Sequence, residues 1–137
     1  MDKILTLGSH YVSDFLDSND NTERKKYSLD LYLDKEIGAT RLQDVAPAET
    51  MWGKYWYRSG INASMTLDLM KLAEQVNSRV KHKEGDVWLD IACNDGTFLK
   101  SFRPYKWELH GIDPAENIVS KINEPDLNLT CDFFPSV

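Results

Sequence analysis

Residues 87–97 have the sequence VWLDIACNDGT, and this stretch decides the fold. The apolar run from Val87 to Ala92 is too short for a helix, and a polar turn that contains Gly96 follows it at once. The run therefore predicts a buried β-strand, and residues 97–102 can begin a helix directly behind the turn. A strand that passes through a tight turn into a helix is typical of the α/β class.

The flanking sequence continues this alternation of helices and strands. Apolar residues recur at spacings of three and four across residues 62–83, which predicts a helix that Gly85 ends. Downstream, residues 107–112 and 127–131 predict two more short strands, with a short helix at residues 114–122 between them. We therefore expect a parallel sheet whose right-handed crossovers place the helices over it.

The first 50 residues have a different character. Apolar residues near Ile4 and a near-alternating pattern from Tyr27 to Leu33 flank a polar turn region from Asp17 to Lys26. These features predict a small β-rich lobe. We accordingly expect two domains, the lobe at residues 1–50 and the α/β part at residues 51–137.

The composition limits the classes of function. With 42% hydrophobic and 28% charged residues among 137, the chain resembles ordinary globular domains that form a packed core. Lys and Arg number 16 against 22 Asp and Glu, and the resulting charge of -6 has the wrong sign for binding nucleic acid or anionic lipid. No apolar run approaches the roughly 20 residues of a membrane span, so we expect a cytoplasmic protein without a nucleic-acid or membrane partner. Two cysteines, Cys93 and Cys131, are expected to be reduced.

The turn after the first α/β strand is the best candidate for a binding site. Small or acidic residues occupy every second position, namely Asp90, Ala92, Asn94 and Gly96. This spacing is similar to that of the loop that holds S-adenosylmethionine in Rossmann-like methyltransferases, where the backbone curls under the amino-acid part of the ligand and a carboxylate receives its ammonium group. A dinucleotide site would need more glycines. The alternative is an ordinary tight turn, in which Asn94, Asp95 and Gly96 satisfy the turn geometry.

Two further positions extend this candidate site. Asp113 follows the second strand, 23 residues beyond Asp90, where a Rossmann-type sheet places an acid on ribose hydroxyls. The alternative is that Asp113 caps the next helix together with Glu116. After the third strand, Asp132 could accept from the exocyclic amine of an adenine and Phe133 could pack on its ring, although a turn and a core aromatic residue are equally compatible with this pattern.

Several segments together resemble one known family. MWGKYWYRSGIN at residues 51–62, WLDIACNDGTFLKSF at residues 88–102 and GIDPAEN at residues 111–117 resemble the S-adenosylmethionine-dependent C-methyltransferases of nucleotide-linked deoxysugars. Upstream, ILTLGSHYVSDF at residues 4–15 and LYLDKEIGATRLQDV at residues 31–45 are similar to the segments next to the zinc ligands of that family. The resemblance covers nearly the whole chain and implies a Rossmann-like class I methyltransferase fold.

The sequence departs from this family in two respects. Asp34 and Ile37 stand where the second cysteine pair would be, the sequence begins past the first pair, and isoleucine cannot bind zinc, so we expect no zinc and no other metal. The sequence also ends soon after the third strand, whereas the family continues through the rest of the sheet and a substrate domain that carries a catalytic histidine. We therefore expect a fold truncated after about three strands, which a second chain could complete.

The aromatic residues from Trp52 to Tyr57 have two interpretations. The resemblance implies that this region closes over the cofactor, that Tyr55 or Tyr57 lies close to the reacting centre as the catalytic tyrosine, and that Arg58 helps to hold the cofactor. Alternatively, these residues are core between lobe and sheet, with Asn62 as the N-cap of the following helix.

The resemblance implies transfer of a methyl group from S-adenosylmethionine to a carbon of a nucleotide-linked keto-deoxysugar. The alternative is a catalytically inactive relative that acts as a binding or interaction protein.

Overall fold

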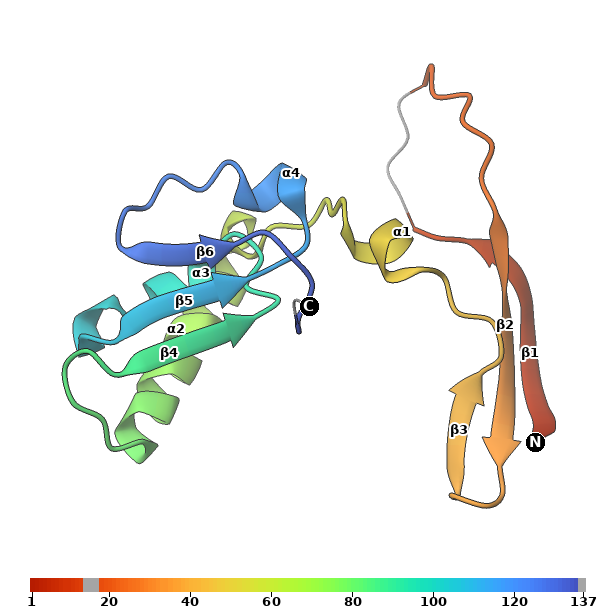
Figure 1. The fold of residues 1–137 in the computed structure, drawn as a ribbon, viewed down its shortest axis with the longest axis horizontal. Helices are drawn as coiled ribbons and strands as arrows, with labels where there is room; N and C mark the ends of the chain where they lie inside the picture. Colours follow the sequence, from red (N-terminus) through yellow and green to blue (C-terminus); the bar gives the residue numbers. More distant parts are fainter. Residues whose placement is uncertain (14–17, 136–137) are drawn as a thin grey trace. The chain divides into compact units, whose positions relative to one another are not determined.

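The computed structural model describes residues 1–13 and 18–135, and the chain divides into two compact units, Met1–Met51 and Trp52–Val137 (Figure 1). The division falls next to the boundary expected from the composition. Asp17, which begins the predicted polar turn region, lies outside the described residues, as do the last two residues of the 4–15 segment. None of the helices in the described residues combines the length and apolar character that a bilayer span requires.

The first unit is a three-stranded antiparallel sheet. Its strands are β1 (Asp2–Tyr11), β2 (Lys26–Asp34) and β3 (Ala39–Leu42), in the order β1-β2-β3. The expected β-rich lobe is therefore present. None of the described residues up to Met51 is buried, so this sheet has no core of its own. Its strands are joined by their backbone ladders, with ion pairs such as Lys3 with Asp30 adding little.

The second unit begins with helical segments. The chain passes through α1 (Ala48–Trp52), which spans the division, and a single 3₁₀ turn η1 (Ser59–Ile61) into α2 (Ala63–Arg79). The expected N-cap is confirmed, because the Asn62 side chain accepts hydrogen bonds from the backbone N–H groups of Ser64 and Met65 at 3.0 and 3.2 Å. The helix ends earlier than the sequence predicts, since Val80 has an extended backbone.

The remaining elements form a parallel sheet with short helices. The strands are β4 (Val87–Ile91), β5 (Glu108–Ile112) and β6 (Leu127–Thr130), in the order β4-β5-β6. Between them lie α3 (Thr97–Lys100), η2 (Arg103–Tyr105) and α4 (Glu116–Val119), which are shorter than expected. The predicted α/β alternation and the parallel sheet are confirmed, and the arrangement is consistent with part of a Rossmann-like sheet.

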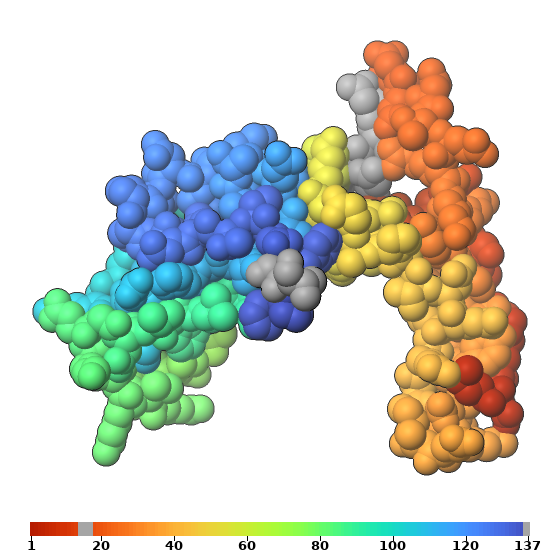
Figure 2. Space-filling model, in the orientation of Figure 1, coloured from red at the N-terminus to blue at the C-terminus, as the bar shows by residue number. Residues whose placement is uncertain are grey.

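The core lies on the face of this sheet that α2 and α3 cover (Figure 1). Leu99 and Phe102 are fully buried, and the ring of Trp88 stacks on Phe102 with centroids 4.0 Å apart. On β4 the alternate residues Val87, Leu89 and Ile91 point to the other face and stay about half exposed. The space-filling view has this face toward the reader, with strand residues in green and blue at the surface (Figure 2).

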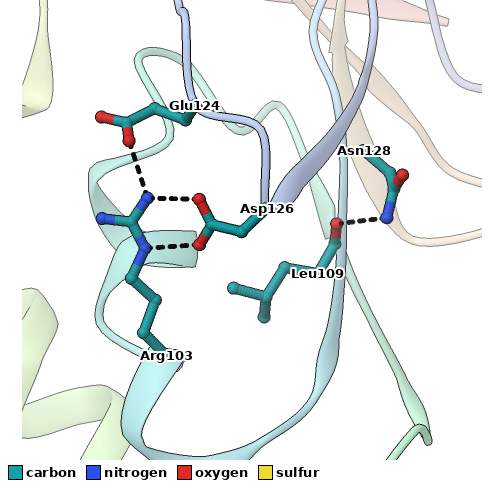
Figure 3. A network of polar contacts seen from close by, with 5 residues as sticks. All are labelled: Arg103, Leu109, Glu124, Asp126 and Asn128. Atoms are coloured by element: carbon teal, nitrogen blue, oxygen red, sulfur yellow. Dashed lines mark hydrogen bonds and ion pairs between the residues drawn. The ribbon is translucent and has the colours of Figure 1, made fainter.

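A network of polar side chains lies where β6 begins. Arg103 donates from Nε and Nη2 to the two carboxylate oxygens of Asp126, at 2.6 and 2.7 Å, and from Nη2 to Glu124 at 2.8 Å (Figure 3). The hydrogen bond from Arg103 holds the pKa of Asp126 below its usual range. Asn128 adds a hydrogen bond to the carbonyl of Leu109, so β6 is fixed to its neighbours by side chains as well as by the ladder.

Gly111 allows β5 to approach α3 closely. A Cβ atom at this position would lie 2.7 Å from Cys93 Sγ, 2.7 Å from Leu99 Cδ1 and 2.9 Å from Leu129 Cδ2. Real Cβ contacts are longer, so any side chain here would push strand and helix apart. The glycine is therefore a packing requirement of the second unit.

We predict that Gly111→Ala destabilises the second unit by about 1–3 kcal/mol, the usual cost of overpacking a core. Urea unfolding followed by tryptophan fluorescence measures this, because Trp88 packs against the core. Gly38→Ala is the control: its Cβ would meet no atom within 4 Å, and the strain that its φ of +67° imposes on alanine falls in the first unit, so the core transition should not move. An unchanged midpoint for Gly111→Ala would contradict the close contact between β5 and α3.

Candidate functional site

A cavity of about 460 Å³ lies at the carboxyl ends of β4 and β5. This is where open α/β sheets bind ligands, and the volume suits a small organic molecule. The lining is largely apolar and includes several aromatic rings, with a few polar groups among them. It consists of Trp52, Tyr55, Tyr57, Ser59, Ile91, Ala92, Asn94, Ile112, Asp113, Pro114, Asp132, Phe133 and Phe134.

The loop after β4 is curled by three residues with left-handed backbone. Ala92, Asn94 and Gly96 have φ of 64°, 51° and 71°. These are the alternate small residues that the sequence singles out, and left-handed backbone disfavours bulky side chains. The N–H groups of Ala92 and Cys93 both donate to the carbonyl of Ile112, at 2.8 and 3.2 Å, which binds the loop to the end of β5. Strained backbone of this kind is characteristic of functional sites.

Asp113 joins the two loops that form the floor of the cavity. The residue is 7% exposed. Its Oδ2 accepts from the backbone N–H of Asn94 at 2.9 Å, and its Oδ1 accepts from the backbone N–H of Ala115 at 2.9 Å. The helix α4 begins only at Glu116 and has no side-chain cap, so Asp113 is not its N-cap. Each carboxylate oxygen retains a second lone pair that a ligand in the cavity could use.

Asp90 lies on the other side of the loop and does not line the cavity. The register pairs it with Gly111, which faces α3, so its carboxylate points toward the helix-covered face. Burial, and then the negative charge of Asp113, raise the pKa of Asp90 to about 6. Burial also raises the pKa of the Cys93 thiol to about 12, with Asp90 as the next cause, so this thiol stays protonated.

Trp52 to Ser59, which we call the aromatic segment, contributes one wall of the cavity. The Asn94 side chain accepts from the N–H of Ser59 and donates to the carbonyl of Tyr57, both at 3.0 Å. Asp95 accepts from the N–H of Gly60 at 2.9 Å. Gly60 permits this approach, because a Cβ there would lie 2.8 Å from Thr97 Oγ1. The loop after β4 therefore holds the aromatic segment by its backbone.

The structure brings together most of the residues that the sequence selects. Tyr55, Tyr57, Ala92, Asn94, Asp113, Asp132 and Phe133 line the cavity, whereas Arg58, Asp90 and Gly96 do not. Within the second unit Tyr55 is half-buried, whereas Trp52, Trp56 and Tyr57 are each more than 40% exposed. Whether these residues form a core between lobe and sheet stays a prediction. The roles of all these residues toward a ligand stay predictions.

Sequence reasoning missed part of the lining. Ile91 and Ile112 are the last residues of β4 and β5 and are paired in register, so the strand ends themselves were a usable signal. Phe134 adjoins the predicted Phe133. Pro114 carried no signal beyond its neighbour Asp113, whereas the family resemblance did imply that Ser59, which also lines the cavity, helps to shape the closure over the cofactor.

In residues 1–13 and 18–135 no group of three or more His, Cys, Asp or Glu side chains is placed to hold a metal ion. Ile37, at one of the positions of the expected cysteine pair, is 74% exposed. The expectation that the chain binds no zinc stays a prediction.

No protein-family model matches the chain. Among curated proteins it is similar to the C-methyltransferase NovU of Streptomyces niveus, with 24% identity over 108 residues. The match covers 79% of this chain and 26% of that protein, so the chain spans about a quarter of the length of the curated relative it matches. This similarity supports a relationship with methyltransferases.

We predict that Asp90 makes stability depend on pH near neutrality. Its folded pKa of about 6 lies above the ordinary value of 3.8, so the folded state binds the proton first as the pH falls. The contribution of Asp90 to the free energy of unfolding therefore increases from pH 7 to pH 4. Asp90→Asn removes the buried charge, so the variant should be more stable than the wild type at pH 7.5, and the difference should shrink by pH 4.5.

Urea unfolding at several pH values measures this difference. Asp126→Asn is the control with the opposite sign, because Arg103 favours the charged form of Asp126 and its replacement should destabilise the protein at pH 7.5. A stability difference for Asp90→Asn that does not vary between pH 4.5 and pH 7.5 would show that the carboxyl is not buried as described.

Proposed function

We propose that residues 52–135 bind S-adenosylmethionine as part of a methyltransferase. The observation that carries this proposal is the charge of the cavity: its lining includes the carboxylates of Asp113 and Asp132, and none of the described lining residues is Lys or Arg. A dinucleotide would have to place its pyrophosphate inside this cavity, where the carboxylates would repel it. S-adenosylmethionine has no phosphate, and its sulfonium and ammonium groups outnumber its carboxylate, so the two carboxylates of the lining would attract it.

The local chemistry also fits an adenosyl ligand. The two free lone pairs of Asp113 could accept from ribose hydroxyls, and Phe133 could pack on an adenine ring whose amine donates to Asp132. The left-handed backbone at Ala92 and Asn94 leaves the loop free of large side chains where the amino-acid part would lie. Three of the residues selected from the sequence do not line the cavity, namely Asp90, Gly96 and Arg58. They would act by supporting the residues that line it.

For the reaction we propose transfer to a carbon atom of a nucleotide-linked keto-deoxysugar. The support is the family resemblance of residues 51–117, together with the similarity to a protein described as a C-methyltransferase. When bound, the cofactor would supply an electrophilic methyl group. Loss of a proton next to the keto group gives an enolate carbon that can accept this methyl.

The residues of this chain would position the acceptor. Tyr55 and Tyr57 line the cavity, and a phenolic O–H can donate a hydrogen bond to an enolate oxygen as negative charge develops on it. The aromatic segment that carries them would also limit the access of water to the cavity. We assign no residue of the lining as the base.

We predict that the full chain binds S-adenosylhomocysteine saturably in calorimetric titration, and NAD not at all. Asp132→Ala and Phe133→Ala should each weaken binding by about tenfold, because one removes an acceptor and the other an aromatic surface. Replacement of Asp113 would not test binding alone, because its carboxylate holds two backbone amides and its loss would alter the loops themselves.

Asp126→Ala is the matched control for Asp132→Ala. It removes a carboxylate six positions away that pairs with Arg103 and does not line the cavity, so it should leave the affinity unchanged. A folded wild-type chain that binds no S-adenosylhomocysteine would refute the proposal. Equal losses in Asp132→Ala and Asp126→Ala would place the ligand elsewhere.

A further inference from the structure

One carboxamide in the second unit pairs with both backbone polar groups of a residue 62 positions away. Asn117, on α4, donates from Nδ2 to the carbonyl of Tyr55 at 2.7 Å. Its Oδ1 accepts from the N–H of the same residue at 2.9 Å. Both bonds are partly buried, and a strand in a sheet would pair with Tyr55 in the same way.

This pairing has a counterpart further along the aromatic segment. Asn94 holds Tyr57 and Ser59 through their backbone, in the same donor-and-acceptor manner as Asn117 holds Tyr55. The three residues so held, Tyr55, Tyr57 and Ser59, are alternate positions of the chain, and Arg58, between the last two, has an extended backbone. Alternate residues of an extended segment face the same side. All three line the cavity, so the backbone bonds leave their side chains available there.

The two contacts differ in origin. Asn94 belongs to the loop after β4, whereas Asn117 belongs to the helix after β5. Asn117 therefore attaches the aromatic segment to the stretch after β5, which also carries Asp113. The carboxamide of asparagine offers a donor and an acceptor at once. The carboxylate of aspartate, which has the same length, keeps the acceptor and loses the donor, and leucine has neither.

We propose that Asn117 is a positioning residue for the cavity: by pairing with the backbone of Tyr55 it fixes this tyrosine over the adenosyl ligand and so sets the affinity for it. This inference rests on the proposed function for the identity of the ligand. The pairing itself rests on the two hydrogen bonds alone.

Amide exchange, read residue by residue by NMR on the full chain, tests the pairing without any ligand. The Tyr55 amide should be protected in the wild type, and Asn117→Leu should reduce its protection roughly tenfold. Asn117→Asp retains the acceptor for this amide and should protect it to an intermediate degree. Asn123→Leu is the matched control, because Asn123 is exposed and lies just beyond the same helix.

Titration with S-adenosylhomocysteine tests the consequence for binding. The affinity should decrease in the order wild type, Asn117→Asp, Asn117→Leu, with a loss of roughly tenfold in the last variant. Asn123→Leu should bind like the wild type. A merely structural role would lower the unfolding midpoint without this graded loss in variants that are still folded. If Asn117→Leu does not fold, the affinity of Asn117→Asp compared with that of the wild type decides whether Asn117 sets the affinity.

The outcomes separate the two proposals. A wild-type chain that does not bind refutes the proposed function and the role of Asn117 in affinity, while amide exchange still decides whether Asn117 holds Tyr55. Binding by the wild type with unchanged affinity in the Asn117 variants overturns the positioning role. Unchanged protection of the Tyr55 amide in Asn117→Leu overturns the pairing.

Discussion

The second unit is organised around the carboxylate of Asp113. Its two oxygens accept from the loop after β4 and from the turn before α4, so a single side chain fixes the relative positions of both loops. The amide that it binds belongs to Asn94, whose own side chain holds Tyr57 and Ser59. A substitution of Asp113 would therefore displace the aromatic segment through Asn94, without any direct contact between Asp113 and that segment.

The electrostatics of this region follow from the same carboxylate. Burial raises the pKa of Asp90, and the charge of the buried Asp113 close by raises it further. With Asp132 at the cavity and none of the described lining residues basic, the region favours a cation. A positively charged ligand would relieve this repulsion, and its binding should therefore depend on ionic strength.

The sequence predicted the features that local rules determine. The cap at Asn62, the strand from Val87 and the tight turn at Gly96 each depend on a few neighbouring residues, and the structure contains all three. The direction of Asp90 could have been anticipated, because it alternates with Trp88 and so shares the core face. The pairing of Asn117 with Tyr55 could not, since nothing local relates residues 62 positions apart.

The first unit has a thermodynamic consequence of its own. The heat-capacity change of unfolding arises mainly from the exposure of buried apolar surface. The described residues up to Met51 include none that is buried, whereas the second unit has a core with fully buried Leu99 and Phe102. Most of the heat-capacity change on unfolding of this chain should therefore come from residues 52–135. The antiparallel sheet would contribute mainly the enthalpy of its backbone ladders and little to this change in heat capacity.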